Sequence, residues 1–159
     1  MKKTITMTVN GQIMKAEVEP RTLLIDCLRD QLGLSGAKVG CVVGKCGACT
    51  IILNGLTVKS CMMFAVQADG AEIMTIEGLA GDGELHPMQQ AFTDKSAVQC
   101  GFCTSGMVLT ATQLAKDHPN ASEEEIKDAI GGHICRCTGY VAIVDAIKEG
   151  CKRMSEQQG

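Results

Sequence analysis

Residues 41–49 read Cys-Val-Val-Gly-Lys-Cys-Gly-Ala-Cys, and a further cysteine stands at position 61. Thiolates are soft ligands, so three closely spaced cysteines and a more distant fourth indicate a metal centre. Glycines at positions 40, 44 and 47 let the chain wrap around such a centre, because glycine accepts positive φ without steric cost. We therefore expect the first half of the chain to fold around this loop.

The spacing C-x4-C-x2-C with a later fourth cysteine is that of plant-type [2Fe–2S] ferredoxins. It predicts that one cluster is held by Cys41, Cys46, Cys49 and Cys61. A structural zinc site and four unrelated buried thiols are the alternatives. The run from Gly40 to Cys46 approaches a P-loop, but it is one residue short and a cysteine replaces the magnesium-binding hydroxyl, so we expect no nucleotide there.

A second set of cysteines lies in the other half of the chain, as C-x2-C and C-x-C. Its members are Cys100, Cys103, Cys135 and Cys137. Each pair precedes a predicted helix, whose N-terminal dipole favours negative charge. One residue between ligands is uncommon in structural zinc sites, and no β-α-β pattern supports disulfide exchange. The chemistry favours an iron–sulfur cluster over zinc and leaves zinc open.

Composition excludes several classes of function. The chain has 159 residues and a net charge of −3, without a basic block, so neither nucleic acid nor an anionic membrane is an expected partner. The N-terminus alternates apolar and polar residues, unlike a signal peptide, and no run is long enough to span a bilayer. We therefore expect a cytoplasmic protein whose ten cysteines serve mainly as metal ligands.

The first half has the pattern of a small sheet with one helix. Residues 4–9 and 12–18 alternate around Asn10-Gly11, which predicts a β-hairpin. Thr22 is the expected N-cap of a helix that buries leucines and Cys27. Residues 50–53 and 56–58 predict a second hairpin, and residues 72–76 another strand. These elements define a predicted domain over residues 1–79.

The second half changes to a helical period. Helices are expected over residues 87–93, 105–116, 122–130 and 140–154, and Ser122 with Glu125 forms a capping-box signature. Gly81-Asp82-Gly83 is the expected linker. Four helices over residues 84–159 suggest a compact bundle, so the predicted fold class is α+β.

Three stretches resemble the signatures of a known family. They are Cys46-Gly-Ala-Cys-Thr50, Val98-Gln-Cys-Gly-Phe-Cys-Thr104 and Cys135-Arg-Cys-Thr-Gly-Tyr140. In order and spacing they resemble the small iron–sulfur subunit of molybdenum hydroxylases, the xanthine oxidase family, over nearly the whole chain. The resemblance implies a plant-type ferredoxin-like (β-grasp) domain followed by a four-helix-bundle domain, each with a [2Fe–2S] cluster.

The resemblance also implies partners and roles. Cys41, Cys46, Cys49 and Cys61 would bind the cluster nearer FAD in a medium subunit, and the second set would bind the one nearer molybdopterin in a large subunit. Gln99 and Cys137 would lie against the pterin. The assembly implied is a dimer of heterotrimers, and no catalytic residue is expected in this chain. Likeness is greatest to carbon monoxide dehydrogenase and N-heterocycle hydroxylase small subunits.

Three residues depart from the family pattern: Lys45, Ser105 in place of a proline, and His133 in place of an asparagine. None of them replaces a ligand. A cation at Lys45 is expected to raise the reduction potential of the first cluster. The three histidines share no spacing, so surface or capping roles are expected for them. Cys27 and Cys151 are unmatched and are expected to be buried as small apolar residues.

The leading hypothesis is an electron-transfer subunit that relays single electrons from molybdenum through two clusters to flavin. The alternative is a free-standing ferredoxin-type shuttle, and a zinc module with a ferredoxin-like graft is a third. A shuttle needs only one cluster, whereas two clusters in one chain form a path for electron transfer between two partners. The substrate stays open among carbon monoxide, an aldehyde, a purine and another N-heterocycle, because the selecting pocket lies in another chain.

Overall fold

The alternating N-terminal segment forms the predicted hairpin. In the computed structural model, which describes residues 1–81 and 83–157, β1 (Lys3–Val9) and β2 (Gln12–Val18) pair antiparallel. Asn10 and Gly11 connect them with φ values of 51° and 78°, the conformation that a type I′ turn requires. Ile5 and Met7 are buried on one face, and the intervening residues are more exposed.

Three further strands complete a mixed sheet. The second predicted hairpin is confirmed as β3 (Thr50–Leu53) and β4 (Leu56–Lys59), and β5 (Glu72–Met74) is shorter than expected. The strand order is β2-β1-β5-β3-β4, with β5 parallel to β1 and antiparallel to β3. Short 3-10 turns η2 (Ser60–Met62), η3 (Ala65–Ala68) and η4 (Ile76–Gly78) join these strands to the rest of the chain.

The helix that covers this sheet is short. It comprises α1 (Leu24–Asp26) and one π-helical turn, η1 (Cys27–Gln31), and Leu24, Cys27 and Leu28 are fully buried. The expected cap was wrong. Leu23 precedes α1 without a side-chain cap, and the Thr22 hydroxyl accepts a hydrogen bond from the Glu19 N–H at 3.2 Å. Thr22 stabilises the preceding turn, which competes for the same hydroxyl.

The predicted helices of the second half are confirmed with small shifts at their ends. They are α2 (Pro87–Asp94), α3 (Thr104–Asp117), α4 (Glu123–Ile130) and α5 (Val141–Gln157). The capping box of Ser122 and Glu125 is present at α4, and His86 caps α2. Within the described residues, no helix has the length and apolar character needed to cross a membrane.

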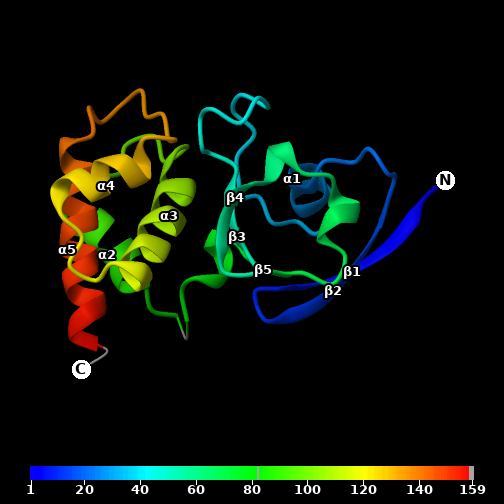
Figure 1. Ribbon diagram of the computed structural model, residues 1–159, viewed down its shortest axis with the longest axis horizontal. Helices are drawn as coiled ribbons and strands as arrows, with labels where there is room; N and C mark the ends of the chain where they lie inside the picture. The colour runs from blue at the N-terminus through cyan, green and yellow to red at the C-terminus, as the bar shows by residue number, and fades with distance from the viewer. Residues whose placement is uncertain (82, 158–159) are drawn as a thin grey trace.

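Two hydrophobic cores divide the structure (Figure 1). One lies between the sheet and α1, and the other is shared by α2, α3, α4 and α5. Ile76 and Leu79, which precede the predicted linker, already pack against the helical core. Asp82 of that linker and residues 158–159 lie outside the described residues. Mixed α/β is therefore the architecture, with a five-stranded sheet and five helices.

The sheet and the helices meet along the start of α3. The Ser105 hydroxyl donates to the Gly36 carbonyl at 2.7 Å, and the Lys59 ammonium donates to the Gly132 carbonyl at 2.9 Å. A Cβ at Gly106 would overlap the Gly47 carbonyl. Only glycine lets the α3 backbone come this close to the loop that carries the first cysteines.

This close approach predicts the effect of Gly106→Ala. In an ordinary helix the change to alanine is stabilising by up to about 1 kcal/mol. Here we expect a loss of about 1–3 kcal/mol in the free energy of unfolding, because the new methyl group has no space. Chemical unfolding followed by circular dichroism measures it.

Gly150→Ala in α5 is the matched control. Its Cβ would meet chiefly the flexible end of the Met88 side chain, which can move aside, so its cost should be smaller. A Gly106→Ala protein as stable as the parent would contradict the packing described.

Candidate metal centres

The first cysteine set is arranged as two pairs around the loop between η1 and β3. The Cys46 N–H donates to the Cys41 Sγ at 3.4 Å, so these two residues face each other, half-exposed. Cys49 lies beside Cys61, and both are buried. The Ser60 hydroxyl holds η2, which carries Cys61, against the Cys49 carbonyl at 2.7 Å. Two pairs of thiols thus meet in one place.

The electrostatics differ between these pairs. The Cys41 Sγ accepts backbone N–H groups from Val43 and Cys46, which lowers the pKa of Cys41 to about 6. Burial raises the pKa of Cys49 to about 11, and the neighbouring Cys61 thiol adds to the rise. At neutral pH the Cys41 thiol loses its proton readily, whereas the Cys49 thiol would need a bound metal to lose its proton.

The loop glycines contribute in two ways. Gly44 and Gly47 have positive φ, as expected from the sequence. Gly40 does not, so the expectation of a left-handed conformation there was wrong. A Cβ at Gly40 would lie 2.8 Å from the Cys46 Sγ, so this glycine leaves space for the thiol.

The second set repeats the arrangement of an exposed and a buried pair. The Cys100 and Cys137 Sγ atoms lie 3.5 Å apart and are exposed, whereas Cys103 and Cys135 are buried. Cys103 is the N-cap of α3, so the expected helix N-terminus is present. The four thiols come from two segments that are far apart in the sequence.

Hydrogen bonds again lower the pKa of one thiol. Burial would raise the pKa of Cys135, but the Thr138 hydroxyl at 3.1 Å and its N–H at 3.4 Å outweigh burial, and the pKa falls to about 7. Burial raises the pKa of Cys103 to about 12, helped by the adjacent Cys135. Each set therefore contains one thiol whose pKa is lowered by hydrogen bonds and a buried thiol whose pKa is raised. In the second set the neighbouring Cys100 thiol also raises the pKa of Cys137.

The geometry fits binuclear clusters. In the described part of the chain, no three His, Cys, Asp or Glu side chains surround one point as ligands of a single metal ion. A [2Fe–2S] cluster instead takes two protein ligands on each of two irons. Paired thiols, N–H groups directed at sulfur and the space beside Gly40 all suit such a cluster.

The two sets are joined by the backbone. The Ile134 N–H, next to Cys135, donates to the Cys46 carbonyl at 3.0 Å. One hydrogen bond therefore connects a cysteine of the first set to the residue beside a cysteine of the second. Figure 1 shows the two loops, cyan and orange, along the same upper side of the molecule.

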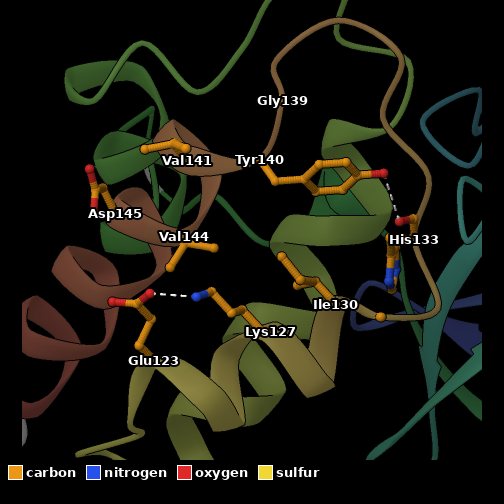
Figure 2. Close-up of a pocket in the computed structure, with 10 residues that line it drawn as sticks. Glu123, Lys127, Ile130, His133, Gly139, Tyr140, Val141, Val144 and Asp145 are labelled. Carbon is orange, nitrogen blue, oxygen red and sulfur yellow. Dashed lines mark hydrogen bonds and ion pairs between the residues drawn. The ribbon is translucent and has the colours of Figure 1, made fainter.

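Tyr140 supports the second loop from the helical side. Its hydroxyl accepts the Cys135 N–H at 2.8 Å and donates to the His133 carbonyl at 3.4 Å (Figure 2). Tyr140 adopts φ of 71°, rare for a residue with a side chain. The same ring borders a cavity of about 560 Å³ between α4 and α5, which no cysteine lines.

His133 does not have the surface or capping role expected for it. Its side chain is 6% exposed and contacts both the sheet and α3. Burial and the Lys59 cation lower the pKa of His133 to about 4, so the ring is neutral at physiological pH. Its position two residues before Cys135 was the available signal, but burial depends on tertiary packing.

The remaining candidates have simpler surroundings. Gln99 is exposed beside Cys100, and no hydrogen bond to its side chain is found among the described residues. Lys45 is exposed in the first loop. Cys27 and Cys151 are buried in the two cores, as expected.

Comparison with known proteins agrees with this geometry. Residues 7–75 match a 2Fe-2S iron-sulfur cluster binding domain, and residues 75–148 match a [2Fe-2S] binding domain. The small FeS subunit of nicotinate dehydrogenase from Eubacterium barkeri is 46% identical, over 96% of this chain and 97% of that one.

Two solved structures have the same fold. Quinoline 2-oxidoreductase from Pseudomonas putida 86 gives a TM-score of 0.95 at 42% identity, covering 99% of this chain and 98% of the matched chain. Aldehyde oxidoreductase from Desulfovibrio desulfuricans gives 0.93 at 40% identity, covering 98% of this chain but 17% of that longer one. The chain therefore belongs to the small iron–sulfur subunits of the molybdenum hydroxylase family, which transfer electrons within these oxidoreductase complexes.

Proposed function

We propose that the two cysteine sets each ligate one [2Fe–2S] cluster. The ligands of the first are Cys41, Cys46, Cys49 and Cys61, and those of the second are Cys100, Cys103, Cys135 and Cys137. The pairing of thiols supports this assignment, as do the N–H groups directed at Cys41 and Cys135. Bound clusters supply one-electron storage, and the chain fixes their order and surroundings.

The observation that supports an electron relay is the order in which exposed and buried cysteine thiols follow one another from the second set to the first. The exposed Cys100 and Cys137 lead to the buried Cys103 and Cys135. From Cys135 the Ile134 N–H···O=C hydrogen bond leads to Cys46. The half-exposed Cys41 and Cys46 are the more accessible thiols of the first set. Such an order suits electrons that enter at the exposed thiols of one set and leave at those of the other.

The surroundings of each exposed pair suggest its partner. Gln99 and Cys137 lie exposed together and would contact molybdopterin in a large subunit. Val42, Val43 and Met62 are exposed apolar residues at or near the first loop, and they would pack against a flavin-binding medium subunit that holds FAD. A cytoplasmic dimer of such heterotrimers is the assembly we propose. Apolar surface of this kind is buried in stable complexes more than in transient shuttles.

The finer fold assignment belongs to the same proposal. The strand order β2-β1-β5-β3-β4 with α1 against it supports a plant-type ferredoxin-like (β-grasp) domain over residues 1–79. The shared core of α2 to α5 supports a four-helix bundle over residues 84–159. Each domain would then hold one cluster.

The substrate is selected outside this chain. The relative from Eubacterium barkeri and the structure from Pseudomonas putida are named for N-heterocycles, and the Desulfovibrio enzyme for aldehydes. We propose an N-heterocycle as the first substrate class to test, with aldehydes and carbon monoxide next. The free-standing shuttle is less well supported, because it gives the second cysteine set no role.

Cysteine substitutions test the ligand assignment. Cys49→Ala in the native complex should reduce iron from about four to about two per chain, because one cluster loses a ligand. Cys27→Ala removes a thiol from the same core and should retain about four. Elemental analysis and electron paramagnetic resonance (EPR) measure the loss.

The helical core offers the same comparison. Cys103→Ala should lose the second cluster, and Cys151→Ala should keep both. Equal iron loss in the control variants would show that the thiols act in packing instead of ligation.

Lys45→Glu tests the charge effect at the first loop. Replacing a cation by an anion beside a negatively charged cluster disfavours adding an electron, so its reduction potential should fall by on the order of tens of millivolts. An EPR-monitored redox titration measures it. Lys15→Glu makes the same charge change on β2, at the sheet edge opposite β4, and should leave the potential nearly constant. An unchanged or raised potential in Lys45→Glu would refute the effect.

A further inference from the structure

The imidazole of His133 connects three parts of the chain. Its Nε2 lies 3.3 Å from the Thr50 hydroxyl at the start of β3 and 3.2 Å from the Thr110 hydroxyl in α3. The residue itself belongs to the segment that leads into Cys135. One buried ring therefore contacts the sheet, a helix and the second cysteine loop together.

The proton of the Thr50 hydroxyl decides which group donates in its contact with His133. The Thr50 hydroxyl donates its proton to the Gly47 carbonyl at 2.7 Å, so toward His133 it can only accept. The Thr50 contact is therefore a hydrogen bond in the ring tautomer that carries its proton on Nε2. Within the described part of the chain, the other ring nitrogen, Nδ1, is buried without a hydrogen-bond partner. An apolar side chain would avoid that unpaired nitrogen, but it could not hold Thr50.

Gly47 makes room for the ring. A Cβ at Gly47 would lie 2.5 Å from the His133 Cδ2, whereas one at Gly106 would be in ordinary van der Waals contact with the same atom at 3.5 Å. Gly47 belongs to the first cysteine loop, directly after Cys46. The ring is thus packed against the backbone that carries the first set of ligands.

The backbone around His133 is held from both sides. Its contacts are Gly132 O with Lys59 Nζ at 2.9 Å, His133 N with Ile130 O at 2.8 Å, Ile134 N with Cys46 O at 3.0 Å and Cys135 N with Tyr140 Oη at 2.8 Å. The bonds from Lys59 and Cys46 come from the sheet side, and the others from the helical side. Figure 2 shows His133 and Tyr140 adjacent on this segment. His133 therefore belongs to a segment, residues 132–135, whose backbone is hydrogen-bonded both to the sheet side and to the helical side.

We propose that His133 is a positioning residue that fixes the separation of the two cysteine sets by fastening residues 132–135 to Thr50 and Thr110. Its hydrogen bonds keep the Ile134 N–H on the Cys46 carbonyl, and thereby keep the connection between the two sets short. This proposal rests on the two-cluster function proposed above.

The test compares Thr50→Val and His133→Ala with Thr112→Val in the native complex. Thr50→Val keeps the shape and removes the hydroxyl, which takes away both the contact with His133 and the hydrogen bond to the Gly47 carbonyl. It is informative even where His133→Ala does not fold, and the change in exchange that it shares with His133→Ala is the part that reports on the histidine. Thr112 is the matched control, because it is also buried in α3 and, among the described residues, its hydroxyl bonds only to the Val108 carbonyl in the same helix.

Two measurements are made on each variant. Hydrogen exchange at the Ile134 amide should accelerate about tenfold in both test variants and stay unchanged in the control. The magnetic splitting between the two reduced clusters, read by EPR, should decrease, because it depends steeply on their separation. Test variants that match Thr112→Val in exchange and in splitting would overturn the proposal.

The two proposals fail differently. If the parent complex shows no second cluster and no splitting, the two-cluster function fails. The exchange rate at Ile134 still reports whether His133 fastens the segment, because that measurement concerns an amide of this chain.

Discussion

The hydrogen bond from the Ile134 N–H to the Cys46 carbonyl is the constraint on which the arrangement of both sites depends. It can form only where two backbones approach closely, and Gly47 and Gly106 permit that approach. The sheet and the helices have separate cores, so the cores alone do not determine how the cysteine loops are placed. The contacts at this junction determine it.

Burial and exposure within each cysteine set follow from this junction. Cys49 and Cys61 are buried toward the sheet core, and Cys103 and Cys135 toward the helical core. The other pair of each set faces outward. Burial raises the pKa values of Cys49 and Cys103, whereas hydrogen bonds to sulfur lower those of Cys41 and Cys135. An electron carrier needs this asymmetry, because insulation between the sites and access at the ends are both required.

Local signals in the sequence predicted most of the fold. Asn10-Gly11 and Asn54-Gly55 form the turns of the two hairpins, and Ser122 with Glu125 caps the start of α4. These effects were predictable because they act within a few residues. Thr22 failed as a cap since a neighbouring turn used its hydroxyl. Spacing and resemblance identified the eight cysteines. The burial of His133 could not be predicted, because its partners are 83 and 23 residues away in the sequence.

The central claim is that this chain carries two [2Fe–2S] clusters in series within a molybdenum enzyme. The most direct measurement is gentle native purification with the chain as bait, followed by counting iron, molybdenum and flavin per chain. We expect about four irons, one molybdenum and one flavin in a large complex. About two irons on a free chain, or zinc in place of iron, would contradict it.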